Sequence, residues 1–339
     1  MSESAVTGET PAPAPRHSRR RSAARNRAEL WAYRGAVGAL SLLPRGAAAS
    51  LGASAALAFT RLSARRRRLL LENLRGAFPE KPPEEIERLA RASARSFGAA
   101  IVNFLAIAGA DVDEVRRRVS ISGLEHYDEA RAKGRGLLLL SAHLGGWELG
   151  AILAAIIDRP VVPVVRPLDN PLLECELARL RTRFGNRVIF KQAAAKGILK
   201  ALRDNEAVVI LIDQNVVASE AVFVPFFGRP AATSPAVALF QQKTGAPVVP
   251  VFVWPLPGGR YHVELQPPIH AEEFFTDGGG ASREDAVLRA TARYTEVTEA
   301  AIRRDPAAWL WMHDRWRTQP TKPPEDGERQ TGNGTRTGR

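Results

Sequence analysis

The sequence contains very little cysteine: one residue, Cys175, in a chain of 339 residues. A single thiol cannot form a disulfide within the chain, and it cannot build a cysteine metal cluster. The histidines do not form a metal site either, because His143, His262, His270 and His313 lack the paired spacing of a zinc site. The sequence therefore predicts no metal site and no internal disulfide.

Common catalytic and nucleotide-binding motifs are missing as well. No Gly-x-Ser-x-Gly segment occurs, which argues against a serine nucleophile that carries an acyl group. No Gly-x-Gly-x-x-Gly segment and no phosphate-binding loop occur, so a bound nucleotide is not expected. Any catalytic chemistry must therefore depend on other side chains.

No apolar run is long enough for a confident membrane span. The first thirty residues are polar and rich in Pro and Arg, without the apolar core of a signal peptide. Residues 30–43 and 46–59 are mostly Ala, Leu, Gly and Val, but Pro44 and Arg45 divide them, and neither half reaches about 18 apolar residues. We predict a helical segment at 30–61 that associates with a membrane, with an ordinary buried pair of helices as the alternative.

Composition and charge suggest the other boundaries. Residues 1–29 and 321–339 are polar and are expected to be disordered tails, the first of them basic, around a folded body at 62–320. The net charge of the chain is +12, and the two tails carry only +3 and +1, which leaves +8 on residues 30–320. A basic body predicts an acidic partner: anionic lipid, a phosphorylated glycolipid, an acidic carrier protein or nucleic acid.

The hydrophobic pattern predicts an α/β fold. Apolar runs typical of buried strands occur at 136–140, 160–165, 187–190, 207–212, 247–253 and 261–265. Helices are expected at 62–76, 81–108, 147–157, 170–184, 192–203, 233–244 and 283–304. Strands that alternate with helices indicate a mostly parallel central sheet flanked by helices. The last two runs are joined by a Pro- and Gly-rich turn and predict a hairpin, so the sheet should be mixed.

Polar side chains follow three of the predicted strands. His143 comes after the first strand, Arg166 after the second, and Asp213 and Gln214 after the fourth. The carboxyl ends of parallel strands meet at one edge of a sheet, where α/β proteins bind their ligands. The sequence therefore predicts a base, a cation and a carboxylate beside an amide at the same edge.

His143 is the candidate general base. Gly145 and Gly146 permit a sharp turn after the strand, and Glu148 follows in the first turn of the next helix, where it can orient the imidazole. Such a base would take the proton of a substrate hydroxyl that attacks an activated acyl group, while Arg166 would bind a phosphate or developing negative charge. The alternative is structural, because a helix dipole favours Glu in the first turn and a His at a strand end can be an ordinary polar residue.

Six blocks of sequence, in order, resemble the bacterial lipid A late acyltransferases, the lauroyl and myristoyl type within the lysophospholipid acyltransferase group. The blocks are a helical entry at 65–80, a His-x4-acid motif at 143–148, an arginine block at 166–172, Asp213-Gln214, a loop at 223–233 and a C-terminal segment at 309–318. The acid of the motif is Glu148, as in the lipid A branch. The resemblance covers roughly residues 30–320.

The resemblance implies a glycerolipid-acyltransferase-like fold, with the acyltransferase domain at 62–320. It implies transfer of a fatty acyl chain from acyl carrier protein or coenzyme A to a glycolipid hydroxyl at the cytoplasmic face of the inner membrane, without a metal or redox cofactor. His143 and Glu148 would be catalytic, and substrate binding would fall to Arg166, Asp213, Gln214, Phe227, Gly228 and Thr233.

The acceptor and the activity itself have alternatives. A lipid A precursor is the expected acceptor, and a phosphatidylinositol mannoside or a lysophospholipid is the alternative. The alternative to an enzyme is a basic protein that binds a membrane or nucleic acid through its Arg-rich helices and does not need His143. Basic runs are, however, common on solvated surfaces of proteins. Among partners, the resemblance favours an acyl donor, a glycolipid and an anionic membrane surface over nucleic acid.

Overall fold

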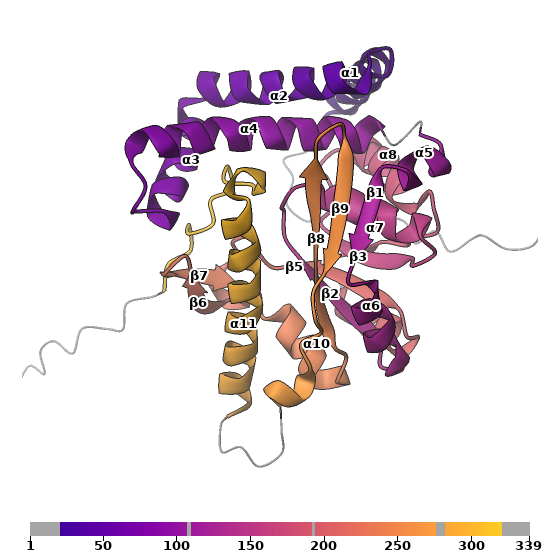
Figure 1. The fold of residues 1–339 in the computed structure, drawn as a ribbon, viewed down its shortest axis with the longest axis vertical. Coiled ribbons are helices and arrows are strands. Elements are labelled where there is room, and N and C mark those ends of the chain that lie inside the picture. The colour runs from indigo at the N-terminus through magenta and orange to yellow at the C-terminus, as the bar shows by residue number, and fades with distance from the viewer. Residues whose placement is uncertain (1–20, 107–109, 192–193, 276–281, 321–339) are drawn as a thin grey trace, which may run out of the picture.

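Seven strands form one mixed sheet in the computed structural model, which describes residues 21–106, 110–191, 194–275 and 282–320 (Figure 1). The strands are β1 Val119–Ser122, β2 Leu137–Ser141, β3 Val161–Val165, β4 Ile189–Phe190, β5 Ala207–Leu211, β8 Val248–Leu256 and β9 Arg260–Leu265. Their order is β1-β9-β8-β2-β5-β3-β4, with β8 and β9 antiparallel and the other neighbours parallel. The predicted mixed, mostly parallel sheet is confirmed.

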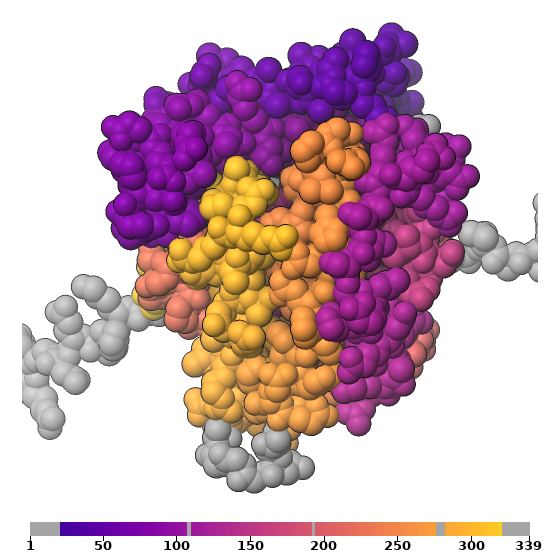
Figure 2. Space-filling view, viewed as in Figure 1, coloured from indigo at the N-terminus to yellow at the C-terminus, as the bar shows by residue number. Residues whose placement is uncertain are grey.

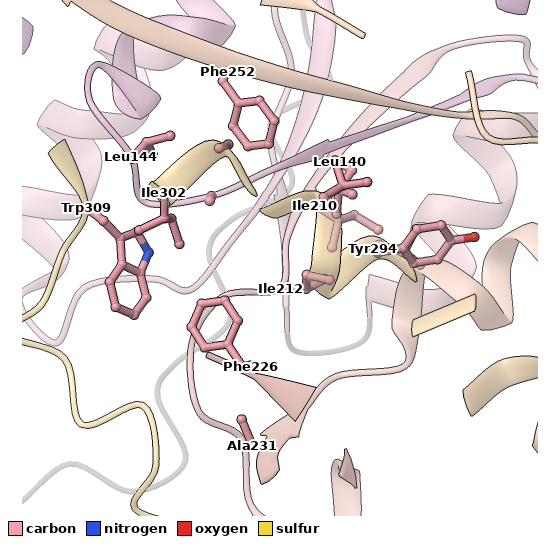
Figure 3. Close-up of a cluster of buried hydrophobic side chains, with 14 of the residues drawn as sticks. Leu140, Leu144, Ile210, Ile212, Phe226, Ala231, Phe252, Tyr294, Ile302 and Trp309 are labelled. Atoms are coloured by element: carbon pink, nitrogen blue, oxygen red, sulfur yellow. The ribbon is translucent and has the colours of Figure 1, made fainter. Parts of the chain in front are cut away.

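Helices cover both faces of this sheet because its central strands are apolar on both. Leu138 and Leu140 of β2 lie in one core, while Leu137 and Leu139 lie in the other. The first face is covered by α9 Ala194–Arg203, α10 Ala236–Thr244 and α11 Arg283–Arg304, and the second by α5 Val112–Arg116, α6 Leu124–Ala132, α7 Trp147–Ile156 and α8 Pro171–Thr182. Figure 3 shows part of the first core, with Leu140, Ile210, Phe226 and Trp309.

A layer of four helices lies across the end of the body toward which β8 points (Figures 1 and 2). The helices are α1 Ala23–Ser41, α2 Arg45–Leu62, α3 Ala64–Ala77 and α4 Pro83–Ala106. Two glycines let α2 and α4 approach closely, since a Cβ on Gly98 would lie 2.2 Å from the Gly52 carbonyl oxygen. The Ser93 hydroxyl of α4 donates to the Trp309 carbonyl at 2.9 Å, which ties the layer to the body.

The N-terminal region differs from the predicted one. Helix α1 begins at Ala23, with the Ser22 hydroxyl accepting from the Arg25 N–H as a cap, so residues 23–29, which were expected to be disordered, are helical. Residues 1–20 and the predicted tail at 321–339 lie outside the described residues. Among the described helices, none is long and apolar enough to cross a membrane.

The sequence missed several short elements. β1 is a four-residue edge strand with alternating exposure, so it lacks the continuous apolar run of the central strands. Strands β6 Val222–Phe226 and β7 Arg229–Thr233 form a separate hairpin, in which Phe227 and Gly228 adopt positive φ angles of 50° and 68°. Three short 3-10 helices, η2 Ala218–Glu220, η3 Ala271–Glu273 and η4 Pro306–Ala308, complete the described elements.

Candidate active site

The turn between β2 and α7 places His143 at the carboxyl end of the sheet. Gly145 has a φ of +56°, and a Cβ there would lie 2.2 Å from the Val253 carbonyl oxygen, so glycine is required. The Gly145 and Gly146 N–H groups donate to the carbonyls of Ala308 and Val253, both at 2.9 Å. The turn is therefore held against β8 and η4, which fixes the direction of the imidazole.

Asp213 holds the imidazole of His143. Its carboxylate follows β5 and is almost fully buried, with Oδ1 2.9 Å from His143 Nδ1 and Oδ2 accepting the His143 backbone N–H at 2.9 Å. The Trp309 indole N–H donates to the same Oδ2 at 2.7 Å. A carboxylate at Nδ1 favours the tautomer with the proton on Nδ1, which leaves Nε2 as the proton acceptor. The side-chain nitrogen of Gln214 lies 3.1 Å from that Nε2.

The two groups stabilise each other's charged forms. Burial alone would raise the pKa of Asp213, but the His143 imidazole and the hydrogen bonds from His143 and Trp309 lower it to about 2. Burial alone would lower the pKa of His143, but the Asp213 charge and hydrogen bond, and the charge of Glu148, raise it above its ordinary value. Such an imidazole is a stronger base than a free one.

Glu148 does not make the contact predicted for it. Its carboxylate accepts from Arg181 of α8, with Nη2 2.9 Å from Oε1 and Nε 3.2 Å from Oε2. Asp213 therefore orients the imidazole, and the prediction that Glu148 does so is wrong. A spacing of five residues brings Glu148 near His143 but does not fix which way the first turn of α7 faces. A catalytic contribution of its charge stays a prediction.

Arg181 connects Glu148 to the loop after β3. The guanidinium is buried, and its Nη1 also lies 3.7 Å from Oε1 of the buried Glu174. The other Glu174 oxygen accepts the Leu168 backbone N–H at 2.7 Å. This chain of contacts positions the loop that carries Arg166, which is exposed and forms no hydrogen bond or ion pair with any residue in the described part of the chain.

A cavity of about 630 Å³ opens beside the imidazole. His143, Glu148, Arg166 and Gln214 line it, so these four predicted residues come together. Most of the remaining lining is apolar and comes from the sheet and from α7, α9 and α10. The site therefore combines a base, a cation with no partner among the described residues, and space for hydrocarbon.

Three predicted substrate-binding residues lie elsewhere. Phe227 is buried with its ring centroid 5.4 Å from that of Phe78, and Gly228 forms the turn of the hairpin. Thr233 is fully buried and accepts a hydrogen bond from Arg315 at 2.6 Å. None of the three lines the cavity, because the hairpin packs against α11, and their assignment to substrate binding stays a prediction.

Comparison with known proteins gives a consistent result. The family model "Bacterial lipid A biosynthesis acyltransferase" matches residues 16–318. The chain belongs to this family. It is 30% identical over 262 residues to a lipid A biosynthesis acyltransferase of Haemophilus influenzae, covering 76% of this chain and 79% of the relative. It is 28% identical to the Escherichia coli lauroyltransferase (77% and 82% covered) and palmitoleoyltransferase (76% and 80% covered) of lipid A biosynthesis.

The C-terminal segment of the acyltransferase supports the loop after β5. Trp309 donates to Asp213, and the His313 Nε2 accepts the Asn215 backbone N–H at 2.9 Å. Burial lowers the pKa of His313 to about 4, so this ring is neutral and remains an acceptor. The sequence marked 309–318 as a family block but gave no reason for it, and the contacts with Asp213 and Asn215 supply one.

No group of three or more His, Cys, Asp or Glu side chains in the described ranges is arranged to hold a metal ion. The predicted lack of a metal site and of a cofactor stays a prediction. The chemistry available at the site is that of the ionised Asp213, the basic His143 and the exposed Arg166.

Replacement of Glu148 tests whether it acts on Arg181 or on the reaction. Glu148→Gln should lower the free energy of unfolding by about 1–3 kcal/mol, because the buried guanidinium of Arg181 loses an ionised partner. Acyl transfer should fall less than in His143→Ala, since the hydrogen bond to Nδ1 remains. Thermal unfolding and kcat measured together check this. An unchanged Tm with a rate as low as that of His143→Ala would contradict it.

Proposed function

We propose that the protein transfers a fatty acyl chain from acyl carrier protein or acyl-CoA to a hydroxyl of a lipid A precursor. The observation that carries the proposal is the His143–Asp213 pair, which leaves Nε2 as a base beside a largely apolar cavity. The catalytic pair is then His143 and Asp213, with Glu148 as a nearby charge. The family match and the names of the relatives support the acyl group and the acceptor.

The reaction proceeds by direct attack. The acceptor hydroxyl gives its proton to His143 Nε2 while its oxygen attacks the thioester carbonyl carbon. Collapse of the tetrahedral adduct breaks the carbon–sulfur bond, and the proton passes from Nε2 to the departing thiolate. An ester and a free thiol result. Asp213 stabilises the imidazolium, and the Gln214 amide, which the hydroxyl displaces from Nε2, donates to the oxyanion.

A direct assay tests the proposal. Purified full-length protein is incubated with acyl carrier protein or coenzyme A thioesters and with a lipid A precursor, a phosphatidylinositol mannoside or a lysophospholipid, and products are identified by mass spectrometry. We expect the acylated lipid A precursor. Product from another acceptor alone would favour the other acyltransferase assignments, and no product with any pair would overturn the proposal.

Arg166 binds a phosphate of the donor or acceptor through its planar guanidinium. It is exposed at the cavity and has no partner among the described residues, so its donors are available. Arg166→Ala should raise KM about 10–100-fold, because the charge-assisted hydrogen bonds to the phosphate are lost. Arg166→Lys should be nearly as damaging, because an ammonium cannot form a bidentate contact. Complete rescue by Lys in steady-state assays would show that only a point charge is needed.

Helices α1 and α2 bring the active site to the membrane. Trp31, Leu42, Leu51, Phe59 and Leu62 are exposed on these helices and their ends, and α2 contains Arg but no acidic residue. Exposed apolar area combined with cations suits an anionic bilayer. The helical layer lies at the carboxyl end of the parallel strands, which is also where the site lies. A membrane bound by this layer would therefore be close to the site, with the protein on the cytoplasmic side of the inner membrane.

Substitution of three residues on this surface tests the anchor. Leu42, Phe59 and Leu62 are changed together to Ser, and sedimentation with phosphatidylglycerol vesicles is measured at low and high salt. We expect most binding to be lost, whereas the matched control with Val217, Leu239 and Leu288 changed to Ser, exposed outside the layer, should bind normally. Equal sedimentation of both variants would place the anchor elsewhere, with the Arg-rich α3 as the next candidate.

A further inference from the structure

A loop of five residues, 166–170, carries Arg166 between the end of β3 and the start of α8. Asn170, its last residue, is only 3% exposed although it is polar. Its side-chain oxygen accepts the Leu172 N–H at 3.0 Å and caps α8, which begins at Pro171. The cap uses only this oxygen, so the NH2 group of the same side chain is available for a second role.

The NH2 group of Asn170 joins the loop to helix α1. It donates to the Asn26 carbonyl oxygen at 3.1 Å and to a carboxylate oxygen of Glu29 at 2.9 Å. These contacts connect residues that are 144 and 141 positions apart in the chain. Both donor hydrogens of a buried amide are therefore satisfied by one helix, which makes the contact specific to the position of α1.

Helix α1 depends on such polar contacts for its position. None of its residues is fully buried, so apolar packing contributes little to holding it. The Arg25 guanidinium lies 3.0 Å from the other Glu29 oxygen and keeps that carboxylate in place. The ion pair of Arg34 with Glu176 of α8 is partly exposed, and such pairs stabilise little. The buried Asn170 amide is therefore a stronger link between α1 and the body than this ion pair.

The loop is also held from α8. The Leu168 N–H donates to the buried carboxylate of Glu174 at 2.7 Å. Arg166 thus extends from a backbone that is fixed at two later positions, at Leu168 by α8 and at Asn170 by α1. A guanidinium on a fixed backbone loses less conformational freedom on binding a phosphate than a guanidinium on a free loop.

We propose that Asn170 is a positioning residue, which holds the loop of Arg166 against α1 so that this helix forms part of the phosphate site. The inference rests on the phosphate-binding role that the proposed function gives to Arg166. Asn170 does not line the cavity beside His143, so its loss should weaken substrate binding without slowing proton transfer. It follows that movement of α1 away from the loop, as on release from a membrane, would raise KM and leave kcat unchanged.

The experiment replaces Asn170 by aspartate and, separately, by serine in the full-length protein. Both residues can still cap a helix, so the start of α8 is kept. Aspartate places a second carboxylate beside that of Glu29, and serine lacks the NH2 group. In both variants, KM for the substrate that Arg166→Ala affects should rise about 3–10-fold, because Arg166 must then be ordered on binding. The kcat should equal that of the wild type.

A double variant separates a positioning role from a general structural one. Asn170→Ser added to Arg166→Ala should leave KM at the value of Arg166→Ala alone, since no guanidinium remains to be positioned. Arg34→Ala is the control, because it removes an ion pair between α1 and α8 that does not involve the loop, and its KM should equal that of the wild type. Glu29→Ala removes an acceptor of Asn170 from the α1 side, and it should also raise KM if the Asn170 variants fold poorly.

Two results would overturn the inference and leave the proposed function intact. The first is a KM equal to that of the wild type in the Asn170 variants that fold, or in Glu29→Ala if neither folds. The second is a KM of the double variant well above that of Arg166→Ala, which would show that Asn170 acts independently of the arginine. A wild-type KM for both substrates in Arg166→Ala would instead remove the phosphate-binding role itself, and the inference with it.

Discussion

Replacing His143 by alanine should reduce acyl transfer by about 10²–10⁴-fold, the usual loss when a general base is removed. The substrate hydroxyl would then have to give its proton to water in an apolar cavity, where few waters can accept it. The fold should survive, because the side chain is partly exposed and the turn is held by backbone hydrogen bonds of Gly145 and Gly146.

The measurement is kcat with a saturating acyl donor and acceptor, beside thermal unfolding and vesicle binding of the same variant. His270→Ala is the control, since this histidine is half-buried at the start of η3 and does not line the cavity. A turnover near that of the wild type in His143→Ala would remove the base assignment and show that another group takes the proton.

Asp213→Asn should lower the maximal rate by a similar factor and also shift the pH profile. Without the carboxylate, the imidazolium formed during transfer loses its stabilising charge, and an Asn amide can donate to Nδ1 and leave the proton on Nε2. Trp309 still donates to the Asn oxygen in this nearly isosteric variant, so the packing should be kept.

The sign of the pH shift follows from the cause of the raised pKa. The base works only when His143 is neutral, so kcat/KM rises with pH through its pKa, which Asp213 raises above the ordinary value. In Asp213→Asn the attraction disappears and burial, which lowers the pKa, dominates. The acidic limb should therefore move to lower pH. An unchanged limb in pH profiles of the two enzymes would mean that another group sets it.

Much of the site was predictable because topology alone brings strand ends together. His143, Arg166 and Gln214 each follow a predicted strand, and parallel strands must place them at one edge. The partner of His143 was not predictable in the same way. From the sequence, either Asp213 or Glu148 could contact the imidazole. In the structure Asp213 makes that contact, while α7 directs Glu148 toward Arg181, which is 33 residues further along the chain.

The loop block at 223–233 shows a different limit. Its sequence marks it as a family feature, but a motif does not show which side of the molecule a hairpin faces. Phe227 and Thr233 are buried against Phe78 and Arg315, residues remote in sequence, so their role is to hold the hairpin and not to line the cavity. Trp309 does support the site, through its hydrogen bond to Asp213, but the sequence could not show this contact because the two residues are 96 positions apart.

The sequence by itself determined the α/β class, six of the seven strands of the main sheet, the family and the edge at which the polar residues collect. These follow from the hydrophobic pattern within each segment and from the order of the segments along the chain. The tertiary structure alone decided which carboxylate holds His143, and which of the predicted residues line the cavity. These depend on distances of a few ångströms between side chains and strands from distant parts of the chain, and packing fixes such distances only when all the elements are in place.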